Sequence, residues 1–478
     1  MTQSKSKYLL NNTILFAISS FGTKLLHFFL VPLYTNVLTT AEYGISDLIL
    51  TIVSLSAFIF TLDISSSTLR FAIDDKDNPQ KVLWFSIKVH SIGSLVFLAF
   101  VFGIYYFNVL RWEPYCYFFL FITFVSSTLY SILSNYLRAI DKIKEVVIIG
   151  LFSSLLVVLF NILFLLIFKL GIIGYLISNI LASLLVSLCC LFIIRPKWEK
   201  REKNDKELGR AMLAYSIPLI FNGVCWWANT SLDKFFIKYM LGDAQNGLYA
   251  VGTKIPGLLT LFQTIFNQAW TLSAIREFDK EDKDGFFSNI YRWYNAGITI
   301  CCSFLIVFNY SFAKILYAKD FFEAWRISSI LTLTIMFSGL SGIVGSVFSA
   351  VKNSRAYATS TIVAAVANAI LNYFFINWLG IQGAAVSTVI SFVIIWAIRL
   401  KLSQQYINMH FRLGRDIFTY IMLFLQVSLE QVIDHSSIHF YLIQGSVFLV
   451  IIIAYRGELQ IITNRLFALV GGLVRENK

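Results

Sequence analysis

Fourteen long apolar stretches follow one another along this chain of 478 residues, and short polar segments separate most of them. A helix needs about 20 apolar residues to cross the hydrocarbon core of a bilayer. Only 14% of the residues are charged, against about 25% in a typical soluble domain. A soluble chain could not bury so much apolar side-chain surface in its cores. We therefore predict an all-α polytopic membrane protein.

The predicted membrane-spanning helices cover residues 9–37, 44–69, 82–108, 115–137, 146–168, 171–194, 211–241, 245–274, 287–309, 326–351, 357–378, 381–400, 416–433 and 438–455. With the N-terminus inside, the inner segments hold 28 Lys and Arg residues and the outer loops hold 6. Short cytoplasmic loops carry the excess of Lys and Arg in membrane proteins. We therefore expect a multi-pass protein of the plasma membrane with both termini in the cytoplasm. The first apolar run is too long for a cleavable signal peptide and lacks a small-x-small site.

An internal repeat organises the chain. Residues 170–178 (LGIIGYLIS) reappear as residues 379–387 (LGIQGAAVS), and the A-x-x-G motif ending at Gly44 reappears with its end at Gly247. Three further residues match at one constant offset: Ala139, Lys144 and Asn161 correspond to Ala350, Arg355 and Asn372. Each repeat holds six spans, an even number, so an axis along the membrane normal should relate the two.

The repeat predicts three regions. Residues 1–205 form an N-terminal six-helix lobe with a charged cytoplasmic linker, and residues 206–402 form a C-terminal six-helix lobe. Residues 403–478 add two helices and an amphipathic cytoplasmic tail.

Several classes of function do not fit this sequence. The net charge of +12 comes from basic residues in short loops, not from one basic stripe with exposed aromatics, so we expect no nucleic-acid partner. The six cysteines offer no C-x-x-C spacing, so neither a zinc site nor a disulfide framework is indicated. No nucleotide-binding loop or catalytic motif stands out, so we predict no enzyme and no cofactor.

Ionisable side chains inside spans are costly and tend to face a cavity or a partner. They gather in spans one, two, seven and eight, the corresponding hairpins of the two repeats. These residues are Lys24 and His27 on one face of span one, Asp47 in span two on a stripe with Thr51 and Ser54, Asp233 and Lys234 in span seven, and Lys254 in span eight. We expect them to meet at a cleft between the halves.

Some polar residues have simpler explanations. Lys238 lies near a span end, and its ammonium group is expected to reach the membrane interface. Asp63 and Lys88 lie in the cytoplasmic third of their spans and could neutralise each other. Pro32, Pro218 and Pro256 interrupt helical hydrogen bonding and could be bending points.

Several motifs resemble those of one family. In the first hairpin these are residues 32–34 (PLY) and 42–44 (EYG), and in the second half residues 231–237 (SLDKFFI) and 247–249 (GLY). With six plus six plus two spans, the chain resembles the Wzx-type polysaccharide flippases of the MOP exporter superfamily. The resemblance implies two helical lobes that alternate between inward-open and outward-open states. It also implies that a lipid-linked oligosaccharide, usually on a polyprenyl pyrophosphate, moves from the inner to the outer leaflet.

Two site assignments follow from residues and resemblance together. Lys24, His27, Lys234 and Lys254 would hold the anionic (pyro)phosphate of the substrate, since a lysine is a mobile point charge that can release it. Asp47 or Asp233 would bind a coupling proton or sodium ion. Glycan polymerase or ligase machinery would be a partner besides the bilayer. The alternative is a multidrug or cation antiporter of the same superfamily, in which these carboxylates would exchange ions. A membrane polymerase is less compatible, because no outer loop is large.

Overall fold

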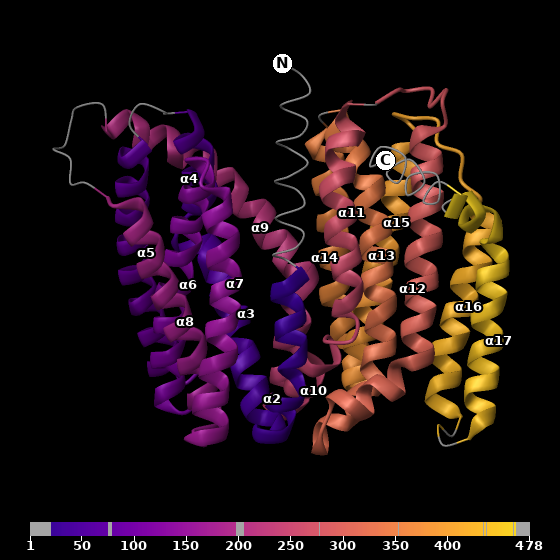
Figure 1. Cartoon of the computed structure of the whole chain (residues 1–478), viewed down its shortest axis with the longest axis horizontal. Coiled ribbons are helices and arrows are strands. Elements are labelled where there is room, and N and C mark those ends of the chain that lie inside the picture. Colours follow the sequence, from indigo (N-terminus) through magenta and orange to yellow (C-terminus); the bar gives the residue numbers. More distant parts are fainter. Residues whose placement is uncertain are drawn as a thin grey trace, which may run out of the picture. The chain divides into compact units, whose positions relative to one another are not determined.

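The computed structural model describes residues 21–74, 79–196, 205–276, 278–351, 353–433, 435, 437–461 and 463–464 (Figure 1). Every regular element in these ranges is a helix. Ten helices in the described ranges are long and apolar enough to cross a membrane. The predicted all-α polytopic fold is therefore confirmed.

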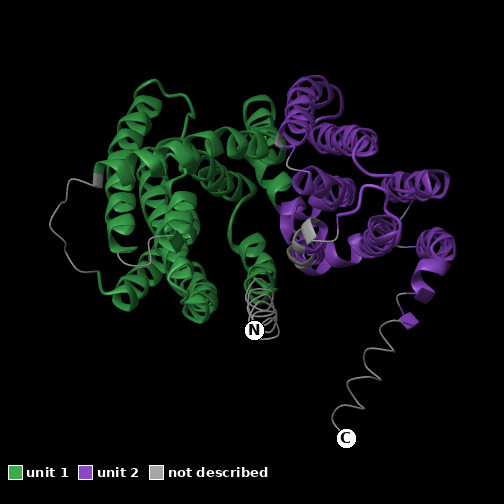
Figure 2. Cartoon of the chain, turned by 90° about the horizontal axis from the view of Figure 1, so that it is seen from above, with its two compact units in different colours: residues 1–250 green, residues 251–478 purple. Residues whose placement is uncertain are grey.

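The chain forms two compact units, residues 1–250 and residues 251–478 (Figure 2). The described helices of the first unit are residues 21–29, α2 (Val31–Val37), α3 (Thr40–Phe60), α4 (Ile64–Asp74), α5 (Pro79–Tyr106), α6 (Pro114–Ala139), α7 (Ile143–Asn161) with the π-helix η1 (Ile162–Ile167), α8 (Gly171–Ile194), α9 (Asp205–Leu241) and α10 (Asp243–Gly252), whose last two residues pass into the second unit. Those of the second unit are α11 (Gly257–Arg276), α12 (Phe286–Leu316), the 3-10 helix η2 (Lys319–Ala324), α13 (Trp325–Ala350), α14 (Ser354–Leu379), α15 (Ile381–Ser403), α16 (Leu413–Val432) and α17 (Ile438–Ala454).

The first unit extends past the first sequence repeat. Helix α9, which opens the second repeat, packs against α3, α4 and α5. One of these contacts is a buried hydrogen bond of 2.6 Å from Ser67 Oγ on α4 to the Met212 carbonyl on α9. The predicted lobe boundaries at residues 205 and 402 follow the sequence repeat and stay a prediction.

The two copies of the L-G-I-x-G motif fold alike. Gly171 and Gly380 both have positive φ, +55° and +59°, at the turns before α8 and α15. A residue without Cβ adopts this conformation without strain. About two turns into each helix, Ser178 and Ser387 are buried and donate to the carbonyls of Gly174 and Gly383 at 2.7 and 2.8 Å. The sequence repeat therefore corresponds to a structural repeat.

The number of spans differs from the predicted fourteen. The ten spanning helices correspond to predicted spans two to seven and nine to twelve. Residues 9–20 of the first predicted span lie outside the described residues, as do residues 197–204 of the linker and residues 465–478 of the tail. The eighth span is divided into α10 and α11 by a turn at residues 253–256, where Pro256 lacks a backbone N–H. The last two correspond to α16 and α17, of 20 and 17 residues.

Proline positions explain only part of where helices break. Pro32 lies in the first turn of α2, a position that proline favours, and Pro218 lies inside α9 without ending it. Within the predicted span 44–69, α3 ends at Phe60 and a second helix, α4, begins at Ile64. Between them, Leu62 and Asp63 have φ values of +53° and +46°. No proline or glycine marks this break.

Candidate functional site

A polar stripe on α3 forms one side of the candidate site. The helix begins at a capping box, in which Thr39 Oγ1 accepts from the Glu42 backbone N–H at 3.2 Å and the Glu42 carboxylate accepts from the Thr39 backbone N–H at 2.8 Å. This start places Asp47 in the second turn of α3. Thr51 and Ser54 follow at i+4 and i+7, which puts all three side chains on one face.

The stripe on α3 meets α9 through an ion pair. Lys234 Nζ lies 2.8 Å from Asp47 Oδ2 and donates a hydrogen bond of 3.3 Å to Thr51 Oγ1. Both charged side chains are 16% exposed, so water screens their attraction only partly. The structure thus brings together two predicted site residues that are far apart in the sequence.

Asp233 lies next to this pair but faces a different partner. It is 3% exposed, and its Oδ2 accepts a short hydrogen bond from the hydroxyl of Tyr249 on α10. Its Oδ1 accepts from the backbone N–H of Lys234 at 3.1 Å. Sequence reasoning missed Tyr249, although the tyrosine belongs to the segment GLY that begins at Gly247. No helical spacing relates Tyr249 to Asp233, because the two residues lie on different helices, α10 and α9.

Trp227 strengthens the contact between α3 and α9. Its indole N–H lies 3.1 Å from both the Thr51 carbonyl and Ser54 Oγ. The ring is 8% exposed, whereas the neighbouring Trp226 is 45% exposed. Trp227 therefore packs inside the unit and fixes the register of the polar stripe against α9.

A second ion pair on α9 corrects one prediction. Lys238 does not extend toward the membrane interface: its Nζ lies 2.6 Å from Asp243 Oδ1, and its side chain is 7% exposed. The ammonium lies 4.9 Å from the centre of the Trp112 ring, whose N–H lies 3.4 Å from the same Asp243 oxygen. The Lys238 ammonium group is therefore held inside the protein by an ion pair with Asp243 and a cation–π contact with Trp112.

The remaining predicted residues lie on other segments. Lys24 is half-buried and His27 is exposed on the helical segment of residues 21–29. Lys254 is half-buried in the turn before α11 and belongs to the second compact unit. No ion pair joins Asp63 to Lys88 in the described part of the chain.

The cluster of Asp47, Lys234, Asp233 and Tyr249 combines two carboxylates with one ammonium group. It can exchange a bound cation or proton, or it can present the lysine to an anion once the pair with Asp47 opens. Within the described ranges, no group of three His, Cys, Asp or Glu side chains is placed to hold a metal ion. The arrangement suits reversible binding.

Comparison with known proteins is consistent with this fold. The sequence profile of a family described as polysaccharide biosynthesis protein matches residues 9–270. Among solved structures, a lipid II flippase, MurJ, in an inward closed conformation is 18% identical with a TM-score of 0.70, covering 95% of this chain and 100% of that chain. An inward-facing multidrug resistance MATE family transporter of the MOP superfamily is 13% identical with a TM-score of 0.65, covering 80% and 94%. No curated protein sequence matches the chain.

Proposed function

Because the chain belongs to the polysaccharide biosynthesis protein family, the Wzx-type flippases of the MOP superfamily, we propose that it translocates a lipid-linked oligosaccharide from the inner to the outer leaflet. The carrier lipid would be a polyprenyl phosphate or pyrophosphate, and the lobes would expose the site to each side in turn. The observation that carries this proposal is the ion pair between Asp47 and Lys234, because it places a releasable cation inside a membrane helix bundle.

The phosphate would be bound by lysines. Lys234 would leave Asp47 when a substrate phosphate arrives, so the ammonium group would exchange one anionic partner for another, and Asp47 would then need a cation in its place. Lys24, His27 and Lys254 complete the proposed set. With both termini in the cytoplasm, the N-terminal ends of α3 and α10 would face outward. Glycan polymerase or ligase machinery at the plasma membrane would receive the product.

Deletion of the gene tests the proposed substrate class. In the source organism, we expect the lipid-linked glycan to accumulate on the cytoplasmic side and the surface glycan to be lost. Complementation with the intact chain should restore export, whereas a Lys24→Ala, Lys254→Ala double variant should not. A deletion strain with unchanged glycan export would contradict the proposal. Full complementation by the double variant would remove only the assignment of Lys24 and Lys254.

A multidrug or cation antiporter is the second candidate. The cluster on α3 and α9 favours it in one respect, because two carboxylates outnumber the single lysine. An antiporter of this kind would move an organic cation outward against protons or sodium. Efflux of ethidium from proteoliposomes, driven by either gradient and absent in Asp233→Asn, would favour this function over the flippase.

A further inference from the structure

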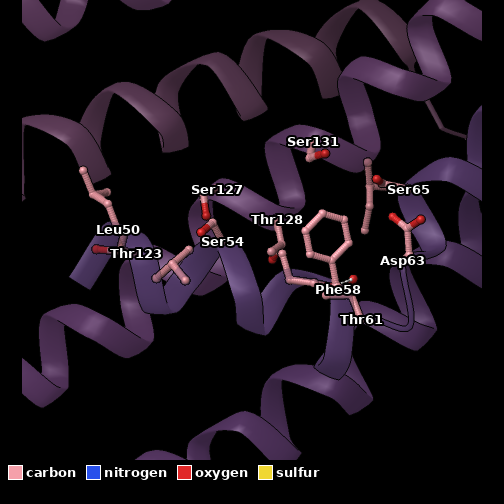
Figure 3. Close-up of a pocket in the computed structure, with 13 residues that line it drawn as sticks. Leu50, Ser54, Phe58, Thr61, Asp63, Ser65, Thr123, Ser127, Thr128 and Ser131 are labelled. Atoms are coloured by element: carbon pink, nitrogen blue, oxygen red, sulfur yellow. Dashed lines mark hydrogen bonds between the residues drawn. The ribbon is translucent and has the colours of Figure 1, made fainter. Parts of the chain in front are cut away.

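A cavity of about 370 Å³ lies between α3, α4 and α6 in the first unit (Figure 3). Seven hydroxyl side chains and the carboxylate of Asp63 line it, together with apolar residues. Asp63 and Ser65 lie at one end, Ser54 and Ser127 lie toward the other, and the ring of Phe58 stands between them. The break of α3 at Leu62 and Asp63, where a continuous helix was predicted, lies at one end of the cavity, and Asp63 belongs to the lining.

Every polar group of this lining can accept a hydrogen bond. The hydroxyls of Ser54, Ser127 and Thr128 donate to carbonyls of their own helices at 2.8, 3.3 and 2.7 Å. A hydroxyl has one proton and two lone pairs, so each of these oxygens can still accept. No lysine, arginine, histidine, asparagine or glutamine lines the cavity in the described part of the chain. The cavity therefore suits a ligand that donates hydrogen bonds.

Another hydroxyl of the lining, that of Thr123, has no partner among the described residues. Thr123 Oγ1 is buried and makes no hydrogen bond with the described residues, and the side chain is only 4% exposed. A buried polar group without a partner is destabilising, so its presence in a cavity indicates that a ligand or water satisfies it.

Size and shape favour a ring over a bare ion. A cation is held by oxygens that surround it closely, whereas cavities that hold small molecules measure about 300–1,000 Å³. The Phe58 ring supplies an apolar wall and lies close to Gly223 on α9, where an added Cβ would come 2.6 Å from the ring. A sugar ring combines the two required features: hydroxyl donors around its edge and an apolar C–H face.

The cavity also lies at a suitable position on α3. Ser54 lines it and accepts from the Trp227 N–H, while Thr51, one turn earlier, accepts from Lys234. Thr51 and Phe58 are seven residues apart, about 10 Å along a helix. A phosphate held by Lys234 would therefore leave a sugar linked to it within reach of the cavity.

We propose that this cavity binds the first sugar ring of the lipid-linked substrate, with Asp63 and the hydroxyls of Thr123 and Ser127 accepting hydrogen bonds from the sugar hydroxyls. The inference rests on the proposed flippase function and adds a site that selects the sugar. Selection would then be separate from phosphate binding.

The test uses the full chain in proteoliposomes and two kinds of synthetic probe. One is fluorescent farnesyl diphosphate carrying a single glucose, galactose or N-acetylglucosamine, and the other is the same lipid diphosphate without sugar. In a Thr123→Val, Ser127→Ala double variant, we expect transport of the preferred sugar probe to fall roughly tenfold, while the sugar-free probe moves at the wild-type rate. Asp63→Asn, which keeps the side-chain shape, should change the rates in the same direction.

Ser91→Ala is the matched control, because Ser91 also donates to a carbonyl of its own helix, at 2.9 Å, but lies exposed on α5 outside the cavity. It should leave both rates unchanged, and thermal melting should show all variants folded. Equal slowing of both probes by the cavity variants would overturn this inference and leave the flippase proposal intact. A cavity variant that changes only the ion dependence of transport would also overturn the inference, since the cavity would then hold a cation. A wild-type chain that moves no probe would overturn both proposals.

Discussion

Gly44 in α3 and Gly247 in α10 occupy equivalent positions in the two copies of the A-x-x-G motif, and their backbones lie against each other. A Cβ on Gly44 would lie 2.0 Å from the Asp243 carbonyl oxygen, and one on Gly247 would lie 1.9 Å from the Thr40 carbonyl oxygen. Thr40 and Asp243 are themselves equivalent in the repeat, so the contact is reciprocal, as at a two-fold axis. Glycines of this kind let helix backbones approach closely inside a membrane.

Replacing either glycine should separate the two helices. The added Cβ would collide with a backbone oxygen, which cannot rotate away as a side chain can, so we expect Gly44→Ala and Gly247→Ala each to destabilise the protein by about 1–3 kcal/mol. The double variant should lose less free energy of unfolding than the two single variants together, since moving the two helices apart once relieves both collisions. Thermal melting of the purified chain in detergent measures all three.

Gly103→Ala is the control for this pair. Gly103 lies inside the spanning helix α5 with no neighbouring atom within 4 Å of an added Cβ, so alanine should be neutral or slightly stabilising. Unchanged melting of Gly44→Ala would show that the helices do not meet this closely.

The two paired lysines of α9 should respond differently to substitution. Lys234→Gln removes the cation proposed to bind phosphate, so transport of the sugar-free lipid diphosphate should fall at least tenfold through a higher KM. Lys238→Gln breaks a pair that holds Asp243 and Trp112 together, so it should lower the melting temperature and leave the KM of the folded protein unchanged. If the two variants had the same effect on KM, Lys234 would have no special role.

The fold was predictable from sequence where the physical signal is local. Apolar run length located ten of the spans, and the L-G-I-x-G repeat located two equivalent turns. The cost of charge in hydrocarbon singled out Asp47 and Lys234, which the structure pairs. These features depend on the residues of one segment or on one energetic penalty.

Features made by packing between helices were not predictable. The break of α3 at Leu62 and Asp63 has no glycine, proline or asparagine to mark it, and contacts with other helices accompany it, such as the hydrogen bond from Asn135 to the Ser65 carbonyl. Serine and threonine in α3 and α6 are unremarkable singly and become a cavity only when the helices meet. Lys238 seemed free to extend to the interface because Asp243 and Trp112 lie on other segments.

Replacing Arg399 on α15 with lysine should destabilise the protein. Its guanidinium is 1% exposed and donates to Ser341 O, Ser360 Oγ and Thr361 Oγ1 at 3.1, 3.0 and 2.9 Å, and no carboxylate of the described residues pairs with it. A lysine has no planar fork to satisfy three acceptors. We expect Arg399→Lys to lower the free energy of unfolding by about 2–3 kcal/mol.

Arg326→Lys provides the comparison for Arg399, since Arg326 pairs with Glu323 at 2.9 Å with both side chains more than 40% exposed. Such pairs contribute little, so its melting should stay within the error of wild type. Equal melting of the two variants would mean that the buried contacts of Arg399 do not stabilise the second unit.

Transport of a charged lipid needs an energy source. An inside-negative potential helps an anionic headgroup move outward, by about 2.3 kcal/mol per charge per 100 mV, but resetting the empty carrier could require an inward cation. Asp47 and Asp233 are the candidates to bind it, and they differ in partner: Asp47 pairs with Lys234 and Asp233 accepts from Tyr249. A proton or sodium ion would reach Asp47 when phosphate draws Lys234 away, so substrate and ion binding would be coupled there.

Transport in vesicles with the proton and sodium gradients imposed separately measures this coupling. We expect Asp47→Asn to abolish the dependence on the effective gradient while the membrane potential still drives transport. Asp233→Asn keeps a carbonyl acceptor for Tyr249, so loss of gradient dependence in that variant would reflect the missing charge and assign the ion to Asp233. Asp243→Asn, which alters the pair with Lys238, should retain the wild-type dependence. If Asp47→Asn and Asp233→Asn both retain it as well, neither carboxylate binds the coupling ion.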